Sequence, residues 1–198
     1  DYLLAEQEVD RAMFDRQIDL IMKDFAPVAQ KFLKHVAKVN GLEKMTFADW
    51  KLDLDSALNP DVTIDDAYDL VMKSVAPLGE EYSREIARYQ TERWVDFAAN
   101  EGKDSGGYAA DPYRVHPYVL MSWTGRMSDV YTLIHEIGHS GQFIFSDNNQ
   151  SYFNAHMSTY YVEAPSTFNE LLLSDYLEHQ FDDPRQKRFA LAHRLTDT

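Results

Sequence analysis

The chain has 198 residues, of which 44% are hydrophobic and 13% aromatic, a composition that supports a folded core and is unlike that of a disordered protein. Its formal net charge of −14 disfavours nucleic-acid binding, which requires clustered Lys and Arg, and no apolar run reaches membrane-spanning length. Because cysteine is absent, the sequence offers no disulfide and no metal-binding thiolate, and a cytoplasmic location is expected.

The first long element is an amphipathic helix over residues 5–39, whose apolar residues recur at helical spacing. The sequence opens on Asp1 with this helical pattern already under way, which indicates a piece of a longer protein. Pro27 is expected to kink the helix or to divide it in two, and Gly41 is expected to end it. We expect one side of the helix to face a core, through Met13, Phe14, Ile18, Ile21, Phe25, Val28, Phe32 and Val36.

The next part of the chain is predicted to hold two more helices. The mixed, polar stretch 44–60 alternates apolar and polar residues like a short strand or a docked loop. Residues 63–75 begin with a capping pattern and favour a helix. Pro77 lies near the first turn of another helix, which is expected to reach about Phe97.

Residues 100–124 break the helical pattern. Glycine and proline interrupt the stretch 100–117, so an irregular loop is expected there, and such loops often carry binding groups. The apolar and aromatic run Tyr118–Trp123 is the best strand candidate in the chain. We expect this loop and strand to line a cleft.

Three helices are predicted in the C-terminal part. The first runs from an N-cap at Ser128 and Asp129 to about Phe145. The second opens at Glu163, and the third begins near Arg185, after a break.

His135, Glu136 and His139 form the pattern H-E-x-x-H within the first of these helices. Residues four apart lie on one face of an α-helix, so both imidazoles can bind one metal ion. The carboxylate of Glu136 lies beside them, where it can accept a proton from a water molecule activated at the metal. The sequence therefore predicts a hydrolytic zinc centre.

A hydrolytic zinc site keeps three protein ligands and leaves its fourth position open. One class places a third His six residues after the second, but that position holds Phe145. The remaining candidates are carboxylates and one imidazole further along the chain: Glu163, Glu170, Glu178 and His156. Glu163 is favoured because it opens the next helix, which can pack antiparallel to the first. Glu170, two turns further on the same face, suits a hydrogen bond to the ring N–H of a ligating His or a place on the helix surface.

Two segments together resemble a known family. The run His135–Ser140, followed by Val162–Ser166, is similar to the metal-binding motifs of the oligoendopeptidase F and thimet oligopeptidase group of zinc peptidases. The resemblance extends from roughly Val39 to the C-terminus. Upstream, the following segments resemble oligoendopeptidase F in the same order: Pro77–Tyr82, Glu92–Asp96, Gly106–Tyr108 and His116–Leu120.

This resemblance implies a mainly α, zincin-like (gluzincin) peptidase core with a small β segment near residues 116–124. Residues 1–198 would then form part of a zinc metallopeptidase catalytic domain. Its expected regions are a helical flank, a loop and strand that line the cleft, and the metal-binding helices, over residues 1–99, 100–124 and 127–198.

The resemblance also implies one Zn²⁺ ion per chain, with His135, His139 and Glu163 as ligands and Glu136 as the general base. The implied activity is hydrolysis of internal bonds of short peptides, within a channel that excludes folded proteins. Neither a nucleic acid nor a membrane is an expected partner.

The sequence departs from this family in two respects. Gly141 and Gln142 stand where relatives often have a bulkier residue and another His, which is expected to alter local packing and not ligation. Family members are also far longer, with an N-terminal helical lobe and a C-terminal segment whose His and Tyr residues help to stabilise the oxyanion. We therefore expect other portions of the same protein to be partners of this chain, which alone would lack those donors.

An extended peptide is expected to pair with the strand Tyr118–Trp123, with His116 and Tyr118 in contact with the substrate. His116 is equally compatible with a loop His bonded to the backbone. Two alternative functions are a non-catalytic helical interaction module with a degenerate H-E-x-x-H and a zinc aminopeptidase with the same ligands. The aminopeptidase would need an acidic site for the free amine of its substrate.

Overall fold

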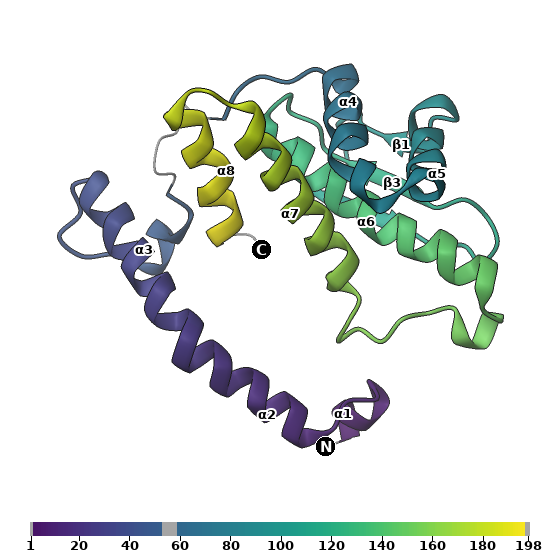
Figure 1. The fold of residues 1–198 in the computed structure, drawn as a ribbon, viewed down its shortest axis with the longest axis horizontal. Helices are drawn as coiled ribbons and strands as arrows, with labels where there is room; N and C mark the ends of the chain where they lie inside the picture. Colours follow the sequence, from purple (N-terminus) through teal and green to yellow (C-terminus); the bar gives the residue numbers. More distant parts are fainter. Residues whose placement is uncertain (1, 53–58, 197–198) are drawn as a thin grey trace. The chain divides into compact units, whose positions relative to one another are not determined.

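The computed structural model describes residues 2–52 and 59–196. The chain divides into two compact units, Asp1–Ala57 and Leu58–Thr198 (Figure 1). Within the stretch 44–60, for which a short strand or docked loop is expected, Phe47–Lys51 forms a 3-10 helix, η2. Residues 53–58 of that stretch lie outside the described residues.

The first unit contains the long amphipathic element, divided into consecutive segments: α1 (Tyr2–Glu6), α2 (Arg11–Leu20), the π-helical segment η1 (Ile21–Phe25) and α3 (Ala26–Val39). Asp10 caps α2, because its side chain accepts a hydrogen bond from the backbone N–H of Met13 at 2.7 Å. Pro27 lies in the first turn of α3, a position that tolerates the missing N–H. The ribbon therefore continues through η1 into α3 (Figure 1).

Within the first unit, most of the apolar side of this element is exposed, whereas a core-facing helix was expected. Val36 is 1% exposed, but Ile18 is 43% and Phe25 is 51% exposed. Of the other seven apolar residues that were expected to face the core, Phe14 and Phe32 are partly buried and the remaining five are exposed. Helical spacing identifies residues that share a face, but it does not identify what covers that face.

The second unit begins with two helices. Thr63 caps α4 (Ile64–Val75) by accepting a hydrogen bond from the N–H of Asp66 at 3.1 Å. A short 3-10 turn, η4 (Ala76–Leu78), leads into α5 (Glu80–Thr91). The prediction that this helix reaches Phe97 is wrong, because Arg93 adopts a left-handed conformation with φ of 58°. The chain then continues as a strand.

A small sheet has three strands in the order β1-β3-β2. β1 (Val95–Asp96) runs parallel to β3 (Tyr118–Met121), and β2 (Gly107–Ala110) runs antiparallel to β3. β3 confirms the β segment expected near residues 116–124. β2 corrects the expectation of an irregular loop, since its glycine and alanines are poor strand formers that pair because of the tertiary fold.

The H-E-x-x-H helix is α6 (Met127–Asn149), and it extends past both expected ends. Asp129 lies in the first turn and not at the N-cap. Its carboxylate accepts hydrogen bonds from the N–H groups of Thr124 at 2.7 Å and Arg126 at 3.1 Å, which satisfies donors at the helix start. The following elements are η5 (Tyr152–Asn154), α7 (Glu163–Gln180) and α8 (Pro184–Thr196).

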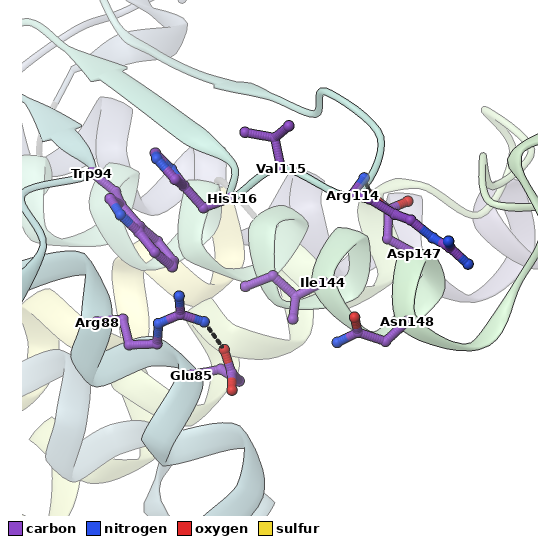
Figure 2. A pocket seen from close by; sticks show the side chains of 9 residues that line it. All are labelled: Glu85, Arg88, Trp94, Arg114, Val115, His116, Ile144, Asp147 and Asn148. Carbon is purple, nitrogen blue, oxygen red and sulfur yellow. Dashed lines mark hydrogen bonds and ion pairs between the residues drawn. The ribbon is translucent and has the colours of Figure 1, made fainter.

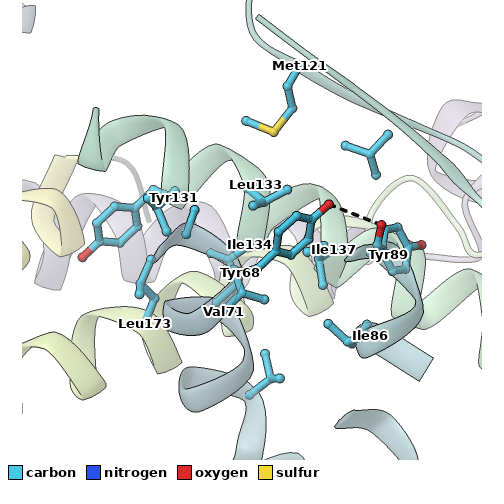
Figure 3. Packing of buried hydrophobic residues seen from close by; sticks show 14 of the residues in the cluster. Tyr68, Val71, Ile86, Tyr89, Met121, Tyr131, Leu133, Ile134, Ile137 and Leu173 are labelled. Atoms are coloured by element: carbon cyan, nitrogen blue, oxygen red, sulfur yellow. Dashed lines mark hydrogen bonds between the residues drawn. The ribbon is translucent and has the colours of Figure 1, made fainter. Parts of the chain in front are cut away.

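The core of the second unit is built around α6, which packs against α4, α5, α7 and the strands β2 and β3. Side chains of α6 lie among those of the neighbouring elements in Figure 3. Leu133, Ile134 and Ile137 of α6 are fully buried, as are Val71 of α4 and Leu173 of α7. Tightly packed neighbours on several sides leave α6 little freedom to shift, so it is a rigid support for the motif that it carries.

Across the residues that the structure describes, no helix is both long enough and apolar enough to cross a membrane.

Candidate metal centre

The two imidazoles of the H-E-x-x-H turn converge on one point. His135 and His139 lie one turn apart on α6, and their Nε2 atoms are 3.2 Å apart. The ring planes cross at 82°, so the two nitrogens approach each other while the rings stay clear. Burial lowers the pKa of His139, which favours the neutral imidazole that binds metals.

Glu163, the first residue of α7, completes a triangle of donor atoms. Its Oε2 lies 3.2 Å from His135 Nε2 and 3.3 Å from His139 Nε2. Three ligands at about 2.0–2.1 Å from a tetrahedral Zn²⁺ ion lie about 3.3 Å from one another. The donor types and their spacing therefore fit a zinc ion, and within the described part of the chain these three residues are the group of His and carboxylates close enough to hold a metal.

The two other candidates for a third ligand lie elsewhere. The carboxylate of Glu178 is 3.8 Å from the guanidinium of Arg194 on α8. His156 is 61% exposed at its side chain, and its Nδ1 is 3.7 Å from Asp111. Neither side chain joins the triangle of donor atoms.

Glu170 lies behind the triangle, two turns after Glu163 on the same face of α7. The Nδ1–H of His135 donates to Glu170 Oε1 at 2.5 Å, and Glu170 is almost fully buried. This bond fixes the tautomer of His135 so that the lone pair of Nε2 points into the triangle. Burial acts to lower the pKa of His135, but the hydrogen bond and the charge of Glu170 outweigh it and raise that pKa.

Glu136 is buried between α6 and strand β2, next to the donor triangle. Burial raises the pKa of this carboxyl, although the positive charge of a protonated His135 opposes the shift. The backbone N–H of Ala109 hydrogen-bonds the carboxylate, so strand β2 helps to orient it. A carboxylate with a raised pKa is a stronger base than an exposed one, which suits a group that must accept a proton near neutral pH.

Gly107 allows this approach of β2 to α6, a contact that the sequence did not predict. A Cβ atom at this position would lie 2.6 Å from Thr132 Cγ2 and 2.8 Å from Glu136 Oε1. Any side chain here would displace the carboxylate or separate the strand from the helix. The adjacent glycines 106 and 107 were the available signal, because glycine inside a strand marks close approach of another group.

The arrangement of the sheet corrects the expected peptide-binding strand. β3 is the central strand and is paired on both sides, so it cannot accept a further strand. The outer edge of β2 is unpaired within the described sheet. Because Ser122 donates to the carbonyl of Gly106 at 3.0 Å, the alternation of an antiparallel ladder directs the polar groups of Gly107 and Ala109 away from β3. The free edge thus lies beside Glu136.

His116 and Tyr118 belong to an aromatic cluster and not to the donor triangle. The ring of His116 stacks on Trp94 with centroids 4.3 Å apart, and the ring centroid of Tyr118 also lies 4.3 Å from that of His116. His116 and Trp94 line a cavity of about 390 Å³ together with Arg88 and residues near the end of α6 (Figure 2). Nδ1 of His116 is 3.1 Å from the Pro117 carbonyl. A role of His116 and Tyr118 in substrate binding remains a prediction.

Two glycines of α6 allow neighbouring elements to lie against its backbone. A Cβ atom on Gly138 would be 2.6 Å from Ser166 Cα and 2.8 Å from the Pro165 carbonyl, so the first turn of α7 rests directly on α6. A Cβ atom on Gly141 would be 2.5 Å from the ring of Tyr82 of α5. The small residue at 141 therefore has a packing partner and does not alter the donor triangle.

Comparison with known proteins agrees with this architecture. Residues 6–198 match peptidase family M3. Oligopeptidase PepF of Bacillus subtilis (strain 168) is 32% identical over 97% of this chain and 28% of its own length. Group B oligopeptidase PepB of Streptococcus agalactiae serotype III is 33% identical over 86% of this chain and 28% of its own length.

A crystal structure of a protein from Chlamydophila abortus superposes with a TM-score of 0.82 and 30% sequence identity, over 98% of this chain and 32% of that one. The chain therefore spans about 28% of the length of these curated relatives. The family match covers residues 6–198 and includes all three residues of the donor triangle. This chain belongs to peptidase family M3.

Proposed function

We propose that this protein is a zinc-dependent endopeptidase that hydrolyses internal bonds of short peptides. The observation that carries the proposal is the donor triangle of His135, His139 and Glu163, with the buried carboxylate of Glu136 beside it. Membership of peptidase family M3 supports the same reaction class. The three donors suit one Zn²⁺ ion per chain, because imidazole and carboxylate ligands in tetrahedral spacing favour zinc.

When bound, a zinc ion would supply a Lewis acid and lower the pKa of water towards neutrality. Glu136 would accept a proton from the attacking water through its carboxylate. It would then deliver that proton to the amine nitrogen that leaves the cleaved bond. The hydrogen bond from the N–H of Ala109 keeps the carboxylate oriented towards the same point.

The free edge of β2 supports a position for the substrate. An extended peptide that adds to this edge would bond to the outward N–H and carbonyl of Gly107 and to the outward carbonyl of Ala109, whose N–H already bonds Glu136. Main-chain pairing does not depend on side-chain identity, so it suits an enzyme that accepts many short peptides. It would also place one peptide carbonyl beside Glu136, which contacts both of these residues.

The test combines zinc analysis with cleavage of an internally quenched peptide whose N-terminus is blocked. We expect this chain to bind one zinc ion, and to cut the blocked peptide when it is assayed together with the other expected portions of the same protein. Glu136→Gln should keep the zinc but reduce cleavage by about 10²–10⁴-fold, the typical contribution of a general base. Glu178→Gln, which alters a carboxylate of α7 outside the donor triangle, is the matched control and should retain both properties.

Three results would contradict the proposal, and each points elsewhere. Cleavage of the free but not of the blocked peptide would indicate an aminopeptidase. Absence of both zinc and cleavage would indicate an interaction module. Full activity of Glu136→Gln would show that another group is the base.

A further inference from the structure

The side chain of Ser166 contacts the proposed ligand carboxylate. Ser166 lies in the first turn of α7, three residues after Glu163, and is 0% exposed. Its hydroxyl donates to Glu163 Oε2 at 2.8 Å and lies 2.9 Å from the Glu163 backbone carbonyl. Oε2 is the same oxygen that faces both imidazoles.

Glu163 is the most exposed of the three donor residues, so its side chain is the least restrained by packing. The side chain of Glu163 is 62% exposed, whereas those of His135 and His139 are 28% and 12% exposed. An exposed glutamate samples many rotamers, and holding it in one of them has an entropic cost. A fixed hydroxyl that donates to the carboxylate favours the rotamer in which Oε2 points at the imidazoles.

The position of Ser166 is itself set by α6. The Cα atom of Ser166 lies against Gly138, the residue before His139, at a distance that leaves no room for a Cβ atom. The hydroxyl is therefore held at a constant distance from the helix that carries both imidazoles. Gly138 and Ser166 together form a backbone contact that brings the start of α7 to the metal-binding turn.

We propose that Ser166 is a positioning residue, which holds the carboxylate of Glu163 towards His135 and His139 and so increases zinc affinity. This inference rests on the ligand set of the proposed function. The alternative is that the hydroxyl only bonds the Glu163 carbonyl, a local contact common in helices. A contact of that kind would not affect zinc affinity.

The test measures the zinc dissociation constant of the purified protein, after removal of metal, by competition with a chromophoric chelator. Ser166→Ala should weaken binding by about 10–100-fold, the typical effect of losing a partner of a metal ligand. Ser174→Ala is the matched control, because Ser174 lies on the same helix, is 1% exposed and bonds Tyr131 at 3.0 Å, outside the triangle. It should leave zinc affinity unchanged.

A double-mutant cycle separates positioning from a general effect on stability. In the background of Glu163→Ala, the substitution Ser166→Ala should have no further effect on zinc affinity, because the carboxylate that it positions is gone. Equal losses in both backgrounds would overturn the inference, as would unchanged affinity of Ser166→Ala. If the unsubstituted protein binds no zinc, the ligand set of the proposed function fails instead.

Discussion

The two units of this chain both contain helices with apolar residues at helical spacing, but they bury those residues to different extents. In α2, η1 and α3, apolar residues recur at helical spacing, yet Val36 is the buried member of that stripe. In α6, Leu133, Ile134 and Ile137 are fully buried, and the helix packs against α4, α5, α7 and the sheet. Equal periodicity therefore has unequal structural consequences, because burial depends on what packs against a face. The metal-binding residues lie on the helix that is packed on several sides.

Truncation of an isoleucine should destabilise the protein far more on α6 than on α2. Ile134→Ala removes a fully buried side chain of α6 and should lower the free energy of unfolding by about 2–5 kcal/mol. Ile18→Ala makes the same change on α2, where the side chain is 43% exposed, and should change it by only about 0.5 kcal/mol. Urea unfolding followed by circular dichroism measures both. Equal losses would mean that the side chain of Ile18 is as buried as that of Ile134.

Alkaline pH should affect the second unit through its buried tyrosines. Burial raises the pKa of Tyr82 and of Tyr131 to about 12, whereas an unfolded chain loses these protons near pH 10. The free energy of unfolding that depends on these protons is therefore fully present below pH 10. It falls as the pH rises towards 12, by roughly 2–3 kcal/mol for each tyrosine. Residues 1–57 contain only the largely exposed Tyr2.

The measurement is urea unfolding at several pH values between 9 and 12. Tyr82→Phe should make the fall in stability shallower. An equally steep fall in Tyr82→Phe would show that this tyrosine is not the source of the pH dependence.

A smaller effect is expected where α7 meets α6. Gly138→Ala places a Cβ atom against the backbone of Pro165 and Ser166 and should lower the free energy of unfolding by about 1–3 kcal/mol. Zinc affinity should fall as well, because Glu163 moves with the start of α7. Gly141→Ala also creates a clash, but with the ring of Tyr82, so it should lower stability and leave zinc affinity unchanged. Chelator competition measures the zinc affinity of both variants. Equal zinc affinities of Gly138→Ala and Gly141→Ala would contradict a role of the Gly138 contact in placing Glu163.

The smallest expected effect concerns the carboxylate behind His135. Glu170→Gln keeps an acceptor for the Nδ1–H but removes the negative charge, so zinc affinity should fall about 10-fold. Glu178→Gln changes a half-buried carboxylate of the same helix, which lies near Arg194 and outside the donor triangle, and serves as the control. Isothermal titration with zinc measures both variants. A loss as large for Glu178→Gln would indicate a general charge effect and not a specific contact.

Much of the fold could be predicted from short-range chemistry. The capping pattern at Thr63 correctly predicted the start of α4, and the apolar run after Pro117 correctly predicted β3. The structure also brings together the three donors that spacing and the order of helices suggested, because residues four apart on a helix must share a face. These features depend on residues that are close in sequence or on one pair of neighbouring helices.

The features that could not be predicted depend on contacts between distant residues. β2 contains glycine and alanines, which have low strand propensity, and it exists because it lies between β3 and α6. The end of α5 depends on the left-handed Arg93 and on the pairing of Val95 with Val119. The choice of β3 as the peptide-binding strand was wrong for the same reason, since strand order is not encoded locally.

Zinc binding by His135, His139 and Glu163 can be measured by X-ray absorption at the zinc edge of the metal-loaded protein, because the spectrum reports the ligand atoms themselves. We expect two imidazole nitrogens and carboxylate or water oxygen at about 2.0–2.1 Å in four-coordinate geometry, with an altered spectrum in Glu163→Ala. A six-coordinate oxygen shell without imidazole, or an identical spectrum in Glu163→Ala, would contradict it.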